Sequence, residues 1–137
     1  MMTIGRLSEQ SGVKVPTIRY YEETGLMPEP ERTEGNQRRY VQAHLDRLTF
    51  IRHARELGFS VDAVHELLSL QADPDAPCAA ADEIAERRLD DIRFRIEKLK
   101  RLEQELLRIT QPHDSETVRD CNVLHALSDH ALCESEH

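Results

Sequence analysis

The feature that most constrains this chain is a segment from Ala79 to Ile109 that contains neither proline nor glycine. Apolar side chains recur along it at alternating spacings of four and three residues, which is the pattern of a heptad seam on one helix face. Such a long helix has to cover its apolar stripe. The seam consists of Ala85, Leu89, Ile92, Ile96, Leu99 and Leu106.

A second copy of the chain is the simplest cover for this seam. Glu103 interrupts the pattern, and Leu102 beside it supports it. The alternative is an intramolecular helical hairpin, which needs a second long helix that the sequence does not offer. We therefore expect a homodimer whose interface includes Leu89, Ile92, Ile96, Leu99 and Leu106.

The first 40 residues predict two short helices and a hairpin. Gly12 and Gly25 are suited to end the two helices, and Pro16 is suited to the first turn of the second. Two short helices joined by a tight turn are typical of a helix–turn–helix. Residues 26–40, with two prolines and a Gly-Asn pair, predict a loop and a small β-hairpin, which would be a wing.

The rest of the chain predicts more helix. A helix is expected from Gln42 to Gly58, another after the N-cap Ser60, and a last short one in the stretch CNVLHALSDH. The expected fold is mainly α. Its parts are a DNA-binding domain with a linking helix pair at 1–71, a dimerisation helix at 72–110, and a metal-binding loop and tail at 111–137.

Charge and aromatic content favour a nucleic-acid partner for the N-terminal part alone. The chain has a formal net charge of −8, but residues 1–60 hold 9 Lys/Arg against 8 Asp/Glu, whereas residues 111–137 hold 1 against 6. All three tyrosines lie between Thr17 and Tyr40, together with several arginines. Arginine binds guanine edges and phosphates, and tyrosine hydroxyls bind phosphates. The expected DNA-contacting residues are Lys14, Thr17, Arg19 and Tyr20 on the second helix and Arg38, Arg39 and Tyr40, projected by the wing.

The sequence shows no signal peptide and no apolar run long enough to span a membrane. The three cysteines, at 78, 121 and 133, are therefore expected to be free thiols or metal ligands and not to form a disulfide framework. A reducing cytoplasm is the expected compartment. Cys121 and His125 are four residues apart, so they share a helix face, and His130 precedes Cys133 by three. Thiolate and imidazole are the donors that zinc and its heavier relatives prefer.

The stretch IGRLSEQSGVKVPTIRYYEETGLMPEPERTEGNQRRY resembles the N-terminal domain of the MerR family of bacterial transcription regulators. The elements IRYYE…GL and R…G.RRY are specific to that family. The resemblance continues through LTFIRHARELGFSVDAVHELLSL and the long helix, and so covers nearly the whole chain.

This resemblance implies an antiparallel dimer that brings Cys78 of one protomer beside the 111–133 loop of the other. It also implies promoter DNA and RNA polymerase as partners, with activation by DNA distortion. A cysteine at the entry to the dimerisation helix resembles the divalent-metal sensors, whereas the copper(I) branch has serine there. We expect zinc, with cadmium or lead as alternatives, at Cys78 and Cys121, completed by His113, His125 or Cys133.

Several alternatives are compatible with the sequence. A copper(I)-responsive regulator would need only two thiolates of the loop, and a redox-responsive regulator would use the thiols. This chain departs from the zinc branch at QPHD, where that branch has the Cys-Cys pair of its two-metal site. Nothing in the sequence predicts a metal-bound water beside a general base, so no enzyme activity is expected. A metal buffer would not need the arginines and tyrosines between Thr17 and Tyr40.

Overall fold

The first two helices of the computed structural model, α1 (Ile4–Ser11) and α2 (Val15–Thr24), end as the sequence predicts. The structure describes residues 1–111 and 117–128. Gly12 and Gly25 follow the helices with φ of 75° and 83°, in the left-handed region that glycine tolerates best. The Thr3 side chain accepts a hydrogen bond from the Arg6 nitrogen at the start of α1. The predicted helix–turn–helix is confirmed.

The predicted wing is a two-stranded antiparallel hairpin of β1 (Glu31–Arg32) and β2 (Arg38–Arg39). Glu31 lies opposite Arg39 and Arg32 opposite Arg38. Asn36 has a φ of 64° in the turn between the strands. Tyr40, directly after β2, exchanges two main-chain hydrogen bonds with Met2, of 2.7 and 2.8 Å. The hairpin is thus attached to the N-terminal segment.

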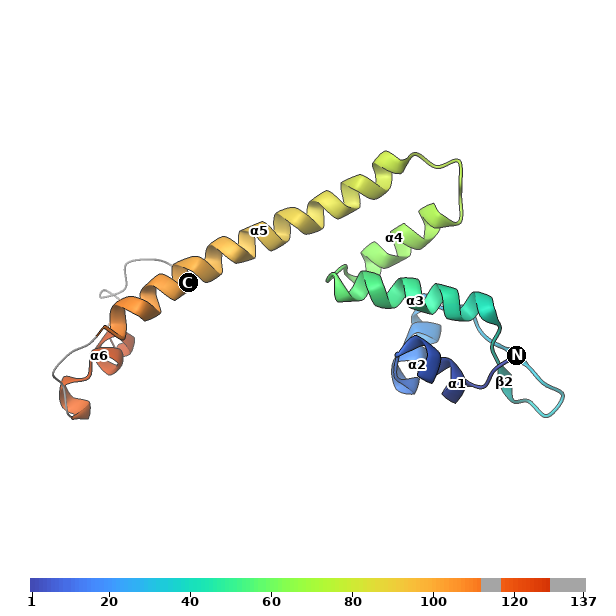
Figure 1. Cartoon of the computed structure of the whole chain (residues 1–137), viewed down its shortest axis with the longest axis horizontal. Coiled ribbons are helices and arrows are strands. Elements are labelled where there is room, and N and C mark those ends of the chain that lie inside the picture. The colour runs from blue at the N-terminus through green and yellow to red at the C-terminus, as the bar shows by residue number, and fades with distance from the viewer. Residues whose placement is uncertain (112–116, 129–137) are drawn as a thin grey trace. The chain divides into compact units, whose positions relative to one another are not determined.

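Two further helices, α3 (Gln42–Glu56) and α4 (Val61–Gln71), complete the N-terminal part of the chain. The Ser60 side chain caps α4 by accepting from the Ala63 nitrogen. In Figure 1, α1 lies against both α2 and α3, and α4 follows α3 after a tight turn. Leu57 in that turn, which continues the helical spacing of α3, is exposed. The buried side chains form one cluster: Leu7, Val13, Ile18, Tyr21, Leu26, Met27, Tyr40, Leu48, Ile51, Ala54, Val64 and Leu68.

The long helix α5 runs from Cys78 to Ile109, 32 residues, in agreement with the long helix predicted from the segment without proline or glycine. At about 1.5 Å per residue it is roughly 48 Å long. The chain forms two compact units, Met1–Ala85 and Glu86–His137, so the division falls within α5. A short 3-10 helix, η1 (Val118–Asp120), and α6 (Asn122–Ser128) follow. Across the described residues, no helix has the length and apolar content that a membrane span requires.

Candidate functional site

The start of α2 presents an exposed, polar surface. Lys14 precedes the helix, and Pro16 and Thr17 lie in its first turn. Arg19 and Tyr20 are exposed on the next turn, Tyr20 to 51%. Ile18 and Tyr21 of the same helix are buried in the core. The buried pair therefore orients α2 so that Arg19 and Tyr20 face solvent, as a recognition helix requires.

The arginines of β2 are less exposed than the sequence suggested, and each is hydrogen-bonded within the protein. Arg38 is half-buried and donates from Nη1 to the Glu22 carboxylate of α2 over 3.2 Å. Arg39 is half-buried and donates to the Gln37 side chain over 3.3 Å. Both guanidinium groups keep further N–H donors for an external acceptor.

The expectation that Tyr40 projects from the wing is wrong. Its side chain is fully buried, with its ring edge-on to His44 at a centroid distance of 5.3 Å. Its hydroxyl donates to the two Glu22 oxygens at 3.2 and 3.3 Å. Side chains alternate faces along an extended strand, so the residue after Arg39 turns back into the core. Burial, and then the negative charge of Glu22 and the hydrogen bond to it, raise the pKa of Tyr40 above its ordinary value of 10.0.

Sequence reasoning missed two residues at this surface, Glu22 and Arg32. A cleft of about 150 Å³ lies between α2 and the wing. Its lining residues are Arg19, Glu22, Glu23, Glu29, Pro30, Arg32 and Arg38. The position of Arg32 opposite Arg38 follows from the hairpin register. Glu22 lies one turn after Arg19 on α2, which is the signal that could have identified it.

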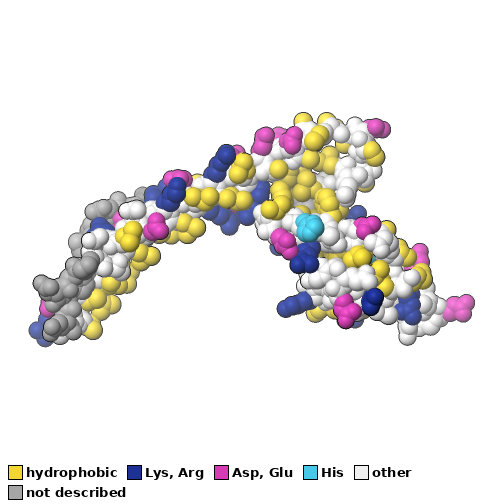
Figure 2. Space-filling view, in the orientation of Figure 1, with side chains coloured by type: hydrophobic (Ala, Val, Ile, Leu, Met, Phe, Trp, Pro, Cys, Tyr) yellow, Lys and Arg dark blue, Asp and Glu magenta, His cyan; other side chains and the backbone are white. Residues whose placement is uncertain are grey.

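The predicted seam of α5 carries large exposed apolar side chains. The exposed fractions are 42% for Leu89, 44% for Ile96, 64% for Leu99 and 59% for Leu106, and Ile92 is half-buried. Figure 2 shows hydrophobic side chains following the helix as a row. No residue of the described chain covers them, so α5 presents a surface of the kind that a partner helix buries.

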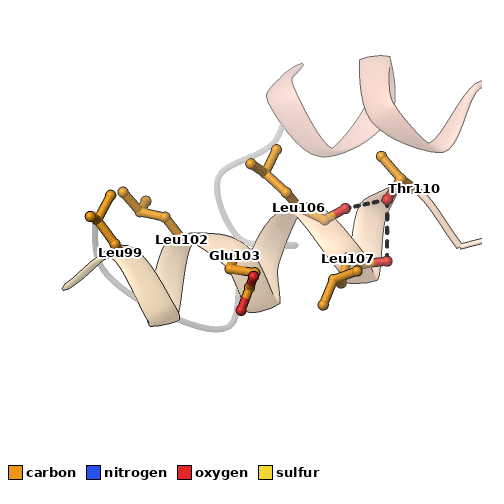
Figure 3. Close-up of a pocket in the computed structure, with 6 residues that line it drawn as sticks. All are labelled: Leu99, Leu102, Glu103, Leu106, Leu107 and Thr110. Carbon is orange, nitrogen blue, oxygen red and sulfur yellow. Dashed lines mark hydrogen bonds between the residues drawn. The ribbon is translucent and has the colours of Figure 1, made fainter. Parts of the chain in front are cut away.

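The C-terminal end of this seam is a shallow apolar groove. Leu99, Leu102 and Leu106 extend to the same side of α5, whereas Glu103 and Leu107 point to the other in the view of Figure 3. Thr110, also in the groove wall, donates to the Leu106 carbonyl over 2.5 Å. Glu103 therefore interrupts the heptad in sequence, but Leu102 keeps the apolar surface continuous.

Cys78 is the first residue of α5 and is exposed. The two prolines before it, at 74 and 77, end the preceding turn and start the helix. Cys78 also forms part of the wall of a hollow of about 400 Å³, whose apolar members include Phe50, Leu67 and Leu70. The thiol is thus accessible at the helix start.

Cys121 and His125 form the second predicted donor pair. Cys121 lies between η1 and α6 and is half-buried, and His125 is exposed on α6. The His125 Nε2 atom lies 2.6 Å from the Arg119 carbonyl oxygen. Because a carbonyl oxygen can only accept, Nε2 carries the proton, and Nδ1 of the neutral ring keeps its lone pair. Metal-binding histidines commonly donate their second nitrogen in this way.

The other expected ligands, His113, His130 and Cys133, lie outside the described residues. Within 1–111 and 117–128, no three histidine, cysteine or acidic side chains come together as a metal cluster. Of the predicted ligands, the structure therefore describes one thiol at the start of α5 and a thiol–imidazole pair beside α6.

A helix–turn–helix with a wing and an exposed polar recognition helix defines a DNA-binding protein. Residues 2–71 match the MerR HTH family regulatory proteins, and residues 45–109 match a second pattern described as MerR, DNA binding. The chain belongs to the MerR family of transcription regulators, which are not enzymes.

Three relatives are regulatory proteins. The mercuric resistance operon regulatory protein of Bacillus cereus is 38% identical over 90% of this chain and 95% of its own length. The regulator ZntR of Escherichia coli K12 is 42% identical over 80% of this chain and 78% of its own. The crystal structure of PbrR691 from Ralstonia metallidurans CH34, in complex with lead(II), is 37% identical and covers 93% of this chain and 99% of its own, with a TM-score of 0.82. These similarities identify this chain as a DNA-binding transcription regulator, and its relatives include regulators of metal resistance.

Proposed function

We propose that this protein is a homodimeric activator of a metal-resistance or efflux promoter, induced by a divalent metal ion bound at its dimer interface. Zinc is the expected inducer, and cadmium and lead are the alternatives. The protein would act in the cytoplasm, on double-stranded promoter DNA, together with RNA polymerase. The observation that carries the proposal is the position of Cys78 as the first residue of a long helix with an exposed apolar seam.

The exposed seam supports a dimer of α5 helices. Leaving Leu99 and Leu106 in water forfeits about 1.5–3 kcal/mol for each side chain that a partner would bury. In an antiparallel pair, the start of one α5 lies beside the end of the other. Cys78 of one copy would then lie near the segment after Ile109 of the second copy, which contains Cys121 and His125.

The donor set supports a thiophilic divalent ion. Two thiolates and one imidazole nitrogen supply three of the four ligands that tetrahedral zinc requires. The lone pair on Nδ1 of His125 is available because Nε2 is hydrogen-bonded to Arg119. His113 or Cys133 would supply the fourth ligand, and His130 is a further candidate. A mercuric resistance regulator and a regulator crystallised with lead(II) among the relatives support this ion class.

Metal binding across the interface would connect the ion to the shape of the DNA. Ligands from both copies fix the angle between the two α5 helices, and each α5 follows a DNA-binding domain. Distorting a promoter costs on the order of 1–6 kcal/mol. Metal binding at a structural thiolate site releases about 10 kcal/mol or more. A modest difference in metal affinity between the two dimer shapes is therefore enough to offset the cost of distorting the DNA. Both the metal-free and the metal-bound dimer bind the promoter. Only the metal-bound dimer brings the two promoter elements that RNA polymerase contacts into register.

The test is transcription in vitro with purified polymerase, preceded by metal analysis of the dimer. The template is a promoter fragment from the genes next to that of the protein, chosen because the protein protects it in a footprinting assay. Zinc, cadmium, lead and copper(I) are titrated into the transcription reaction. Induction by a divalent ion at constant promoter occupancy supports the proposal. Release of the protein from DNA on adding metal would show derepression and contradict activation.

Two alternative inducers are separated by the same assay. Induction by copper(I) alone would assign the protein to the copper(I) class. Induction by a thiol oxidant such as diamide, in the presence of chelator, would assign it to the redox-responsive class.

A further inference from the structure

The Glu22 carboxylate joins the recognition helix to the wing. It lies in the last turns of α2, and its side chain is only 8% exposed. It accepts hydrogen bonds from Arg38 Nη1 at 3.2 Å and from the Tyr40 hydroxyl at 3.2 and 3.3 Å. One acidic group therefore contacts β2 and the residue after it.

The wing depends on such contacts for its orientation. Its strands are two residues each, and an isolated two-stranded hairpin is marginal in water. The Met2–Tyr40 main-chain pair attaches the base of the hairpin to the N-terminal segment. Glu22 provides the side-chain contacts to α2, and a buried carboxylate is tolerated because both of its partners satisfy it.

One cleft is lined by arginines from both sides of the Glu22 contact. Arg19 enters it from α2, and Arg32 and Arg38 enter it from the wing. Arg32 lies directly opposite Arg38, and like charges at such positions repel. Glu22 offsets that repulsion through Arg38, and Arg32 donates to the Asn36 carbonyl over 3.2 Å.

We infer that Glu22 is a positioning residue for DNA recognition, which sets the spacing between Arg19 on α2 and Arg38 on the wing so that both reach the same duplex. This inference rests on the proposed DNA-facing roles of Arg19 and Arg38. Glu22 does not contact DNA itself. Its carboxylate holds the Arg38 guanidinium by one edge and leaves the other N–H groups for the duplex.

The experiment compares affinity for two duplexes across a salt series. One is an operator duplex selected by the parent protein from a random library, and the other is a scrambled duplex of equal length. Glu22→Gln keeps the shape of the side chain and removes its charge. We expect it to lower the selected-to-scrambled affinity ratio about tenfold, as coupled contacts of this kind do. Affinity for the scrambled duplex should rise, because the protein gains one positive charge.

Three further variants make the result specific. Glu9→Gln changes the charge equally at an exposed position of α1, and the ratio should stay within twofold of the parent. In an Arg38→Gln background, Glu22→Gln should have no further effect on the ratio. Glu22→Asp keeps the charge on a shorter arm, and it should also lower the ratio, which covers the case in which Glu22→Gln does not fold.

The outcomes distinguish this inference from the DNA-facing role of Arg38. Arg38→Gln should weaken the salt dependence by about one unit of slope, whereas Glu22→Gln should not. If Arg38→Gln retains the parental ratio and slope, the role of Arg38 in DNA binding is wrong. If Arg38→Gln lowers both but Glu22→Gln and Glu22→Asp keep the parental ratio, only the positioning role is wrong. Equal losses from Glu22→Gln with and without Arg38 would likewise overturn it.

Discussion

The main-chain nitrogen of His125 donates to the Cys121 carbonyl oxygen over 3.1 Å, which places the two side chains one turn apart at the start of α6. Residues four apart on a helix share a face, so one ion can bind both. The His125 ring is further held by its contact to Arg119. This geometry connects the donor chemistry to measurable consequences.

We predict that Cys121→Ser and Cys78→Ser each weaken zinc binding by more than about 100-fold, because even outer-shell partners of metal ligands contribute about 10–100-fold. A competition titration against a chromogenic chelator measures the change. Ser69→Ala, at an exposed position of α4, is the control and should bind zinc as the parent does. Parental affinity in Cys78→Ser would contradict a site shared between subunits.

We predict that Arg19→Ala costs about 1–3 kcal/mol of specific DNA binding and leaves metal binding intact, because the side chain is exposed on the recognition helix. Fluorescence anisotropy with the selected operator duplex measures the loss. Arg101→Ala removes an exposed arginine from α5 and should retain the parental affinity. Protection of the operator by Arg19→Ala at parental concentrations would show that α2 does not read the DNA.

We predict that Ile96→Asp dissociates the dimer, since it would bury a charge without a partner on the apolar seam. Sedimentation velocity at micromolar concentration measures the assembly. Phe94→Asp is the matched control, because Phe94 is 64% exposed on the same helix but lies outside the seam, so this variant should remain dimeric. A monomeric parent protein would rule out the interface.

We predict that Gly12→Ala destabilises the N-terminal unit by about 1–3 kcal/mol. Gly12 has a φ of 75°, and a Cβ there would run into the Arg52 guanidinium, whose Nη1 donates to the Ser11 carbonyl over 2.8 Å. Urea unfolding followed by circular dichroism measures the change. At Gly35 a Cβ meets only Thr33 Oγ1 at 3.8 Å, so Gly35→Ala should stay within about 0.5 kcal/mol of the parent. Equal stability of the two variants would exclude this packing.

We predict that the parent protein loses stability above pH 10 more steeply than Tyr40→Phe. The pKa of Tyr40 is raised in the folded state, so the contribution of its neutral hydroxyl is complete below the unfolded value of 10.0 and is lost as the pH rises toward the folded value. Unfolding free energies between pH 8 and pH 11 measure the difference. Parallel profiles for the two proteins would mean that Tyr40 titrates in the fold as it does in the unfolded chain.

Local signals in the sequence determined the elements and the class of protein. Gly12 and Gly25 ended α1 and α2, Ser60 capped α4, and the heptad spacing identified α5, because each signal acts within a turn or two of the chain. The arginines and tyrosines between Thr17 and Tyr40 identified the DNA-binding part. The exposure of Arg19 on the second helix follows from helical periodicity. The thiols and imidazoles identified candidate ligands by their chemistry alone.

Only the tertiary structure decided which polar residues face solvent. Tyr40 follows two arginines in the sequence and looked like a third wing contact, yet it packs against His44 and donates to Glu22. Glu22 looked like one more charge on a surface helix, yet it is nearly buried between α2 and the wing. These positions depend on contacts 16 to 18 residues apart, between a helix and a hairpin, and no helical or strand period in the sequence encodes such contacts.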